Sequence, residues 1–332
     1  GDIKYLIDWT TLGEFLDSLV RRGISLNVAS FVGATSVRVY VLGEDDRDPT
    51  PAELARMQDL VRQAMREGAL GVGSSLIYAP AFFAETPELI ALAQAAAESG
   101  GGYVSHVRNE SYRLEVAIDE LIEITRACGG HGEAYHLKAA GEANWGNMAR
   151  AIAKIEEARR QGVAVSANMY TYTAGSTGFD AAMPLWVQAG GLDAWVARLK
   201  DPQQRARVIG EIRNPPAGEE NLYRTAGSPD RVLLVGFKNP PLKPLTGKTL
   251  ADVMKMRGTS AEDTIVDLVI EDNSRVQVIY FLMSEDNVKL GLSQPWVSLG
   301  SDAEALAPEG VFMKSSTHPR AYGNFARLLG KY

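Results

Sequence analysis

The sequence predicts an α/β fold in which helices cover a parallel sheet, arranged either as a barrel or as a doubly wound sheet. Short apolar segments alternate with segments whose apolar residues recur every three or four positions, the pattern of amphipathic helices. No apolar segment shows the strict alternation that is typical of an antiparallel sheet with one wet face. Polar, ligand-like residues end several successive strands, which favours the barrel over the open sheet.

The elements can be placed along the chain in order. Helices are expected at Leu12–Arg22, Thr50–Glu67, Thr86–Ser99, Tyr112–Ile124, Asn147–Arg160 and Ser260–Ile270. Strands are expected at Ile24–Phe31, Gly68–Tyr78, Tyr103–His106, Glu133–His136, Val163–Tyr170, Val276–Met283 and Trp296–Asp302, with a loop at Val32–Thr35. Gly23 should end the first helix, and Thr50 with Glu53 should form a capping box at the start of the second.

The rhythm of these elements divides the chain into three regions. Residues 1–177 are expected to form barrel βα units, and residues 260–332 the closing barrel units with a C-terminal loop. Residues 178–259 break the rhythm with proline- and glycine-rich loops. We interpret them as a small inserted subdomain of helices and loops, such as a lid, although a second domain boundary has the same composition.

Composition excludes several classes of partner. The 332 residues carry a net charge of -7, which argues against nucleic acid or an anionic membrane as the main partner. No apolar run approaches the ~20 residues of a membrane span, and the first residues lack the pattern of a signal peptide. The single cysteine, Cys128, fits a reducing compartment, so we expect a cytoplasmic protein.

Two of the four histidines end successive predicted strands. His106 ends the first strand and His136 the next, with an amphipathic helix between them. Parallel strands joined in this way lie side by side, and ligands bind at their carboxyl ends. The pair could therefore bind one metal ion. The alternative is that each histidine is only a polar residue with a hydrogen-bond partner, and these residues alone do not decide between the two.

A third candidate ligand ends the last predicted strand. If the strands belong to one barrel, Asp302 converges on the same mouth as His106 and His136. Two imidazoles and a carboxylate suit zinc, which activates water for attack on a carbonyl. The alternative for Asp302 is a cap at the start of a helix or loop.

Five segments together resemble a known family. These segments are HVRNE (106–110), HLKAAG (136–141), YTYTAGST (170–177), GSDA (300–303) and HPRAYGNFARLLGKY (318–332). They are similar in sequence and in order to N-acyl-D-amino-acid deacylases, the D-aminoacylase-type members of the amidohydrolase superfamily. The resemblance runs along essentially the whole chain.

The resemblance implies a fold, an activity and a set of roles. It implies a zinc-dependent hydrolase on an incomplete or distorted (β/α)8 TIM-type barrel of the metallo-dependent hydrolase kind. The activity is hydrolysis of N-acyl-D-amino acids to a carboxylate and a D-amino acid. The implied roles are listed by group: zinc ligands His106 and His136; general base Asp302; substrate-binding residues Lys138, Tyr170, Ser176 and Arg320.

The sequence also departs from the family pattern. It has no His-x-His motif, and Cys128 is not in the position of the family's zinc-binding cysteine. We therefore expect a central and C-terminal portion of such a barrel, whose open sheet edges must be covered or paired, for example in a homo-oligomer. Two other hypotheses remain: a different amidohydrolase reaction, on cyclic amides or dipeptides, or an inactive fragment or pseudoenzyme with a binding role.

Overall fold

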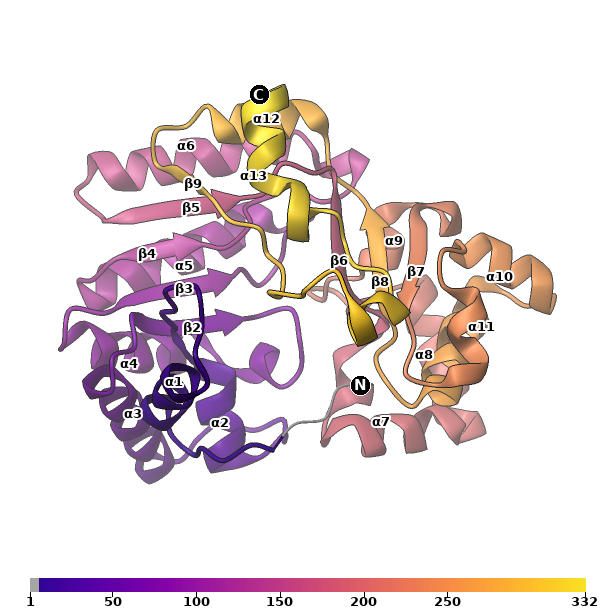
Figure 1. Cartoon of the computed structure of the whole chain (residues 1–332), viewed down its shortest axis with the longest axis horizontal. Helices are drawn as coiled ribbons and strands as arrows, with labels where there is room; N and C mark the ends of the chain where they lie inside the picture. The colour runs from indigo at the N-terminus through magenta and orange to yellow at the C-terminus, as the bar shows by residue number, and fades with distance from the viewer. Residues whose placement is uncertain (1–5) are drawn as a thin grey trace.

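The computed structural model describes residues 6–332 and contains a six-stranded parallel sheet (Figure 1). Its strands, in spatial order, are β1 (Val32–Gly33), β2 (Gly71–Ser75), β3 (Gly102–His106), β4 (Gly132–Ala134), β5 (Val165–Met169) and β9 (Val297–Leu299). Every pairing in this sheet is parallel. Within the described residues β1 and β9 do not pair with each other, so the sheet is an open part of a barrel rather than a closed one.

Helices alternate with the strands of this sheet in the βα rhythm that the sequence predicts. They are α2 (Ala34–Leu42), α3 (Pro51–Arg66), α4 (Thr86–Ala97), α5 (Leu114–Cys128), α6 (Asn147–Arg160) and α12 (Glu285–Leu292). Consecutive helices from α2 to α6 pack against one another, and their apolar faces form one core with the sheet. This arrangement places the carboxyl ends of the strands on one edge.

Capping chemistry sets several of the helix boundaries. The first helix, α1 (Leu12–Arg22), ends at Gly23, whose φ of 78° is the left-handed conformation that glycine adopts without strain. Thr50 accepts from the backbone N–H of Glu53, and the Glu53 carboxylate accepts from the backbone of Thr50 in return. The predicted capping box at the start of α3 is therefore confirmed.

The chain between β5 and β9 forms a second layer with its own sheet. This sheet is antiparallel, with the order β6 (Ala174–Gly178), β8 (Gln277–Phe281) and β7 (Val232–Gly236). Helices α7 (Gly191–Lys200), α8 (Pro202–Arg213), α9 (Leu222–Ala226), α10 (Leu250–Arg257) and α11 (Ala261–Asp272) accompany it. The last helix, α13 (Arg320–Lys331), returns to the end of β5 and lies over the mouth of the main sheet (Figure 1).

Two expectations about strands are wrong. Val276–Met283 is not a closing barrel strand, because β8 is the central strand of the antiparallel sheet. A central strand buried on both faces gives a continuous apolar run in either kind of sheet, so the sequence does not distinguish them. Ile24–Phe31 is not a regular strand either: its side chains at Leu26 and Val28 are exposed, and only Val32–Gly33 pairs.

The second sheet joins strands from both sides of the predicted subdomain boundaries. Its strand β6 spans the expected boundary at 177, and β8 follows the boundary at 259. The three-region division therefore stays a prediction. Among the residues that the structure describes, no helix is long and apolar enough to cross a membrane.

Candidate metal centre

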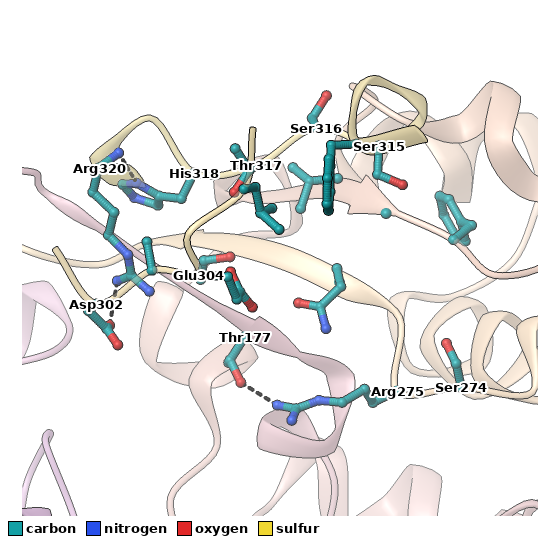
Figure 2. A pocket seen from close by; sticks show the side chains of 18 of the residues that line it. Thr177, Ser274, Arg275, Asp302, Glu304, Ser315, Ser316, Thr317, His318 and Arg320 are labelled. Carbon is teal, nitrogen blue, oxygen red and sulfur yellow. Dashed lines mark hydrogen bonds and ion pairs between the residues drawn. The ribbon is translucent and has the colours of Figure 1, made fainter. Parts of the chain in front are cut away.

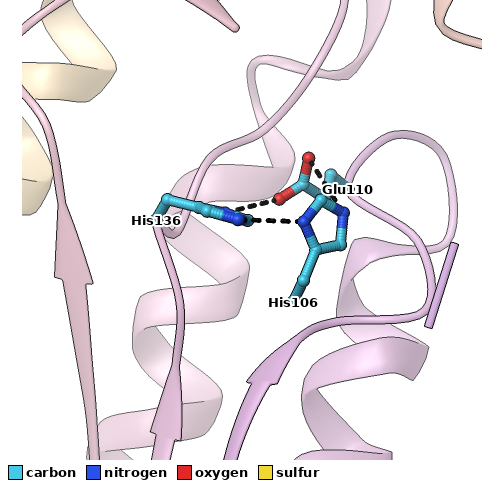
Figure 3. Close-up of side chains that lie close together, drawn as sticks. All are labelled: His106, Glu110 and His136. Carbon is cyan, nitrogen blue, oxygen red and sulfur yellow. Dashed lines mark hydrogen bonds and ion pairs between the residues drawn. The ribbon is translucent and has the colours of Figure 1, made fainter. Parts of the chain in front are cut away.

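His106 and His136 meet at the carboxyl edge of the main sheet. His106 is the last residue of β3, and His136 lies two residues beyond β4. The Nδ1 atom of His106 is 2.9 Å from Nε2 of His136, and the ring planes are nearly perpendicular at 76° (Figure 3). His136 has a φ of 38°, an unusual conformation outside glycine, and its backbone N–H donates to Asn168 on the next strand. The backbone is thus held in a strained conformation that aims the ring at His106.

A carboxylate that the sequence analysis assigned no role completes the cluster. Glu110 lies four residues after His106, and its Oε1 atom is 3.1 Å from His136 Nδ1. Its Oε2 atom is 3.7 Å from His106 Nε2. His106, Glu110 and His136 are buried, and they can each offer one ligand atom within 4.8 Å of the others. Two imidazoles and one carboxylate are a donor set that catalytic zinc sites use.

The protonation states of the cluster suit a cation. Burial lowers the pKa of His106 to about 3, although the Glu110 charge acts to raise it, so this ring is neutral, as a metal ligand must be. Burial acts to raise the pKa of Glu110, but His106 and Lys138 outweigh it and lower that pKa, so the carboxylate is charged. His106 Nε2 is buried and has no hydrogen-bond partner in the described structure. These residues therefore fit a zinc ion.

Lys138 belongs to the same buried cluster. Its Nζ atom lies 2.5 Å from Glu110 Oε1 and 2.7 Å from His136 Nδ1. Burial acts to lower the pKa of Lys138, yet the Glu110 charge prevails and raises it, so the ammonium stays charged. Its predicted contact with a substrate carboxylate stays a prediction, because its described partner is Glu110.

Asp302 and Arg320 form a second pair beside the cluster. The Arg320 Nη1 atom is 2.7 Å from Asp302 Oδ2, and the guanidinium lies over the Tyr170 ring at 4.5 Å. Asp302 follows β9 with a φ of 48°, a second left-handed residue at a strand end. The Tyr170 hydroxyl is buried and has no hydrogen-bond partner among the described residues, and burial raises its pKa.

All seven residues singled out from the sequence line one cavity of about 280 Å³. Ser176 reaches it from β6 of the second sheet, where its hydroxyl donates to Val278 O at 3.2 Å. The lining therefore combines the two layers of the fold. The seven residues are His106, His136, Lys138, Tyr170, Ser176, Asp302 and Arg320. Their convergence is observed, whereas the role of each stays a prediction.

Two acidic residues of this region were missed. Glu110 stands in the HVRNE motif, and its i+4 spacing from His106 was a usable signal. Glu220 had no such signal, because it is 110 residues from the group it contacts: its Oε2 accepts from the Glu110 backbone N–H at 2.9 Å. Burial, and then the Glu110 charge, raises the pKa of Glu220 to about 7.

Comparison with known proteins identifies homologues of the chain. No protein-family model matches it. D-aminoacylase of Alcaligenes xylosoxydans xylosoxydans is 29% identical over 320 residues, which are 96% of this chain and 54% of that protein. The chain thus spans about half the length of the relatives it matches.

Two solved structures extend this result. N-acyl-D-glutamate deacylase from Bordetella bronchiseptica, complexed with zinc and a phosphonate mimic of the tetrahedral intermediate, matches with a TM-score of 0.76 and 27% identity, covering 97% of this chain and 56% of that one. A D-aminoacylase with a binuclear metal centre matches with a TM-score of 0.74 and 26% identity over the same shares. The predicted α/β fold of TIM-barrel type and the predicted resemblance are both confirmed.

Proposed function

We propose that this chain belongs to a zinc-dependent hydrolase of N-acyl-D-amino acids. The reason is that its homologues are D-aminoacylases and N-acyl-D-glutamate deacylases. The products are a carboxylate and a D-amino acid. The observation that carries the proposal is the buried cluster of His106, Glu110 and His136 in the cavity that Asp302 also lines. A fold-level resemblance alone would not suffice, because one fold hosts many activities.

The metal would be held by the buried cluster. His106 supplies a neutral imidazole, His136 a second imidazole ring, and Glu110 the negative charge. Zinc, when bound there, polarises the amide carbonyl and lowers the pKa of water to about 7. The carboxylate of Glu110 is shared with Lys138, so the ammonium also balances the charge of the cluster.

The other residues of the cavity would bind the substrate and move protons. Asp302 accepts the proton of the attacking water and passes it to the leaving amine, and its exposed fraction of 37% lets a water reach it. Arg320 holds that carboxylate in place and is a cation for the substrate carboxylate. The hydroxyls of Tyr170 and Ser176 orient the amide, and the Tyr170 hydroxyl has no other partner in the described structure.

The experiment is a joint measurement of zinc content and turnover on the whole protein. Zinc per chain is determined by elemental analysis after purification without chelators, and hydrolysis is followed with matched N-acetyl-D- and N-acetyl-L-amino acids. We expect bound zinc, D-selective hydrolysis and loss of both in His136→Ala. The control is His131→Ala. His131 directly precedes β4, its side chain is half-exposed, and it lies outside the cluster.

Two results would reject the proposal. One is zinc-free protein with full activity, and the other is a His136→Ala variant that keeps its zinc and its turnover.

A cytoplasmic location and a homo-oligomeric state stay predictions from the sequence, as do the residue roles given above.

A further inference from the structure

A second cavity of about 590 Å³ adjoins the cavity of the metal centre. The two share lining residues at their junction, namely Tyr78, Ser176, Thr177, Asp302 and Arg320. The second sheet forms one wall, and the segment from Asp302 to Arg320 lies across from it (Figure 2). A group attached to an amide in the first cavity can therefore extend into the second.

The charges of this second cavity balance. Arg320 is paired with Asp302, as described above, and Arg275 is paired with Asp180 at 3.0 Å. Arg275 also donates to the Thr177 hydroxyl at 2.6 Å. The remaining charged side chains of the lining are one cation, Lys238, and one anion, Glu304. A ligand with a net charge would disturb this balance, so the cavity favours an uncharged one.

The lining combines hydrogen-bonding hydroxyls with apolar side chains, among them Val235, Phe237, Leu306 and Phe312. Hydroxyls of Ser274, Ser315, Ser316 and Thr317 add to those of Ser176 and Thr177, and Figure 2 shows most of them around the cavity. A hydroxyl both donates and accepts. A peptide matches such a mixed surface, because its amide groups pair with the hydroxyls while its apolar atoms contact the other side chains; a plain hydrocarbon chain would leave the hydroxyls unpaired.

We propose that the second cavity binds a large, uncharged, hydrogen-bonding substituent of the scissile amide, such as a peptidyl group. The inference rests on the proposed function and narrows its substrate class. An acetyl group is far smaller than 590 Å³ and leaves the cavity to water. The substituent can be the acyl group or the side chain of the D-amino acid, since both branch from the amide in the first cavity.

Gln277 is the position at which the cavity can be filled without touching the site. It is the first residue of β8, its side chain is exposed, and its neighbours across the sheet, Gly178 and Gly236, have no side chains. Gln277→Trp keeps a residue with good strand propensity and places a large ring in the cavity. Phe281→Trp is the matched control, because Phe281 lies four residues along on the same face and does not line either cavity.

The test compares four acyl groups on one D-amino acid by kcat/KM: acetyl, acetylglycylglycyl, octanoyl and succinyl. We expect the peptidyl substrate to exceed the acetyl one by roughly tenfold, as one or two net hydrogen bonds would give. Octanoyl and succinyl should not share this gain. In Gln277→Trp the gain should vanish while acetyl turnover stays within about twofold, and Phe281→Trp should keep both.

A second arm distinguishes the two sources of the substituent. N-acetyl derivatives of D-glutamine, D-leucine and D-glutamate are compared in the same proteins. If the cavity receives the side chain, the D-glutamine substrate shows the gain and its loss in Gln277→Trp. If neither arm shows a gain that Gln277→Trp removes, the inference is overturned even when N-acetyl-D-amino acids are cleaved.

Failure of the proposed function has a different signature, which is absence of turnover on every substrate. The cavity is then tested by calorimetric titration with acetylglycylglycyl-D-leucine and with acetyl-D-leucine. Weaker binding of the peptide alone in Gln277→Trp supports the cavity assignment. Equal binding of the peptide in Gln277→Trp and the wild-type protein overturns it.

Discussion

The imidazoles of His106 and His136 face each other with ring nitrogens 2.9 Å apart, although the residues are 30 positions apart in the chain. They reach this distance because β3 and β4 are parallel neighbours whose carboxyl ends lie on the same edge. Burial keeps the His106 ring neutral, so its nitrogens can act as ligands. The pair is thus held ready for a cation by the sheet itself rather than by a flexible loop.

The first prediction concerns Glu110, which supplies the charge of the cluster. Glu110→Gln keeps the shape of the side chain and removes its negative charge beside two imidazoles and Lys138. We expect the dissociation constant for zinc to rise at least roughly tenfold, as loss of a ligand or of its partner typically gives. Competition with a chromogenic chelator measures it. Glu115→Gln is the control, because Glu115 on α5 pairs with Arg150 on α6, away from the cluster; equal affinities in the two variants would remove Glu110 from the centre.

The second prediction concerns the pH dependence of stability at the start of α3. Hydrogen bonds from Arg47, and then from Thr50, lower the pKa of Glu53 to about 2 from its ordinary value of 4.5. A folded pKa below the unfolded one gives stability that is present above 4.5 and is lost as pH falls toward 2. We expect Glu53→Gln to have a lower Tm than the wild-type protein at pH 7, and this gap to narrow at pH 3. Because the pair is exposed, the gap should be small; a gap that stays constant with pH would contradict the assignment.

Local signals in the sequence predicted much of the fold. The bounds of α1, the capping box of α3 and the strand end at His106 all follow from short-range patterns, whereas β4 ends at Ala134, two residues before the expected end at His136. Apolar periodicity and capping involve residues only a few positions apart, so they can be recognised without knowledge of the tertiary structure. Strand-end patterns also marked His106, His136 and Asp302, whereas Lys138, Tyr170, Ser176 and Arg320 came from the family resemblance; all seven line one cavity.

Long-range pairing could not be predicted in the same way. β8 reads as a buried strand in any sheet, and only its partners β6 and β7 make it part of the second layer. Glu220 reaches the Glu110 backbone from a loop that follows α8, a contact that no spacing rule encodes. The sequence analysis therefore did not predict how the residues between β5 and β9 fold back onto the metal centre.

The third prediction tests this contact between the second layer and the metal centre. Glu220 accepts the backbone N–H of Glu110, and the Glu110 carbonyl accepts from Ala140 N at 2.7 Å, so both backbone polar groups of Glu110 are held. Glu220→Ala should free the peptide and weaken zinc binding roughly 10-fold or more. Glu220→Gln should restore most of the affinity, because its amide oxygen still accepts the bond.

Glu219 provides the control for this experiment. Its carboxylate accepts from Leu185 N at 2.9 Å, on the same loop but away from the cluster. Glu219→Ala and Glu220→Ala should show similar losses in Tm, since each leaves one backbone donor unpaired. Only Glu220→Ala should change the zinc affinity; a parallel change in both variants would mean that Glu220 is a purely structural residue.

The fourth prediction concerns Arg320, which contacts both Asp302 and the Tyr170 ring. A guanidinium can pair with a carboxylate and stack on a ring at the same time, whereas a lysine ammonium cannot reproduce this geometry. Arg320→Lys keeps the charge but should lower kcat/KM for an N-acyl-D-amino acid by at least roughly tenfold. Arg327→Lys is the control, because Arg327 also stacks on a tyrosine, Tyr172 at 4.9 Å, from the same helix.

The division of this loss between kcat and KM identifies the role of Arg320. If the guanidinium mainly binds the substrate carboxylate, KM rises and kcat changes little. If it mainly holds Asp302 for proton transfer, kcat falls, because a lysine ammonium does not hold the Asp302 carboxylate in the same position. Since Arg320 Nη1 pairs with Asp302 Oδ2 at 2.7 Å, we expect the effect on kcat to dominate. An unchanged kcat in Arg320→Lys would place the residue with the substrate instead.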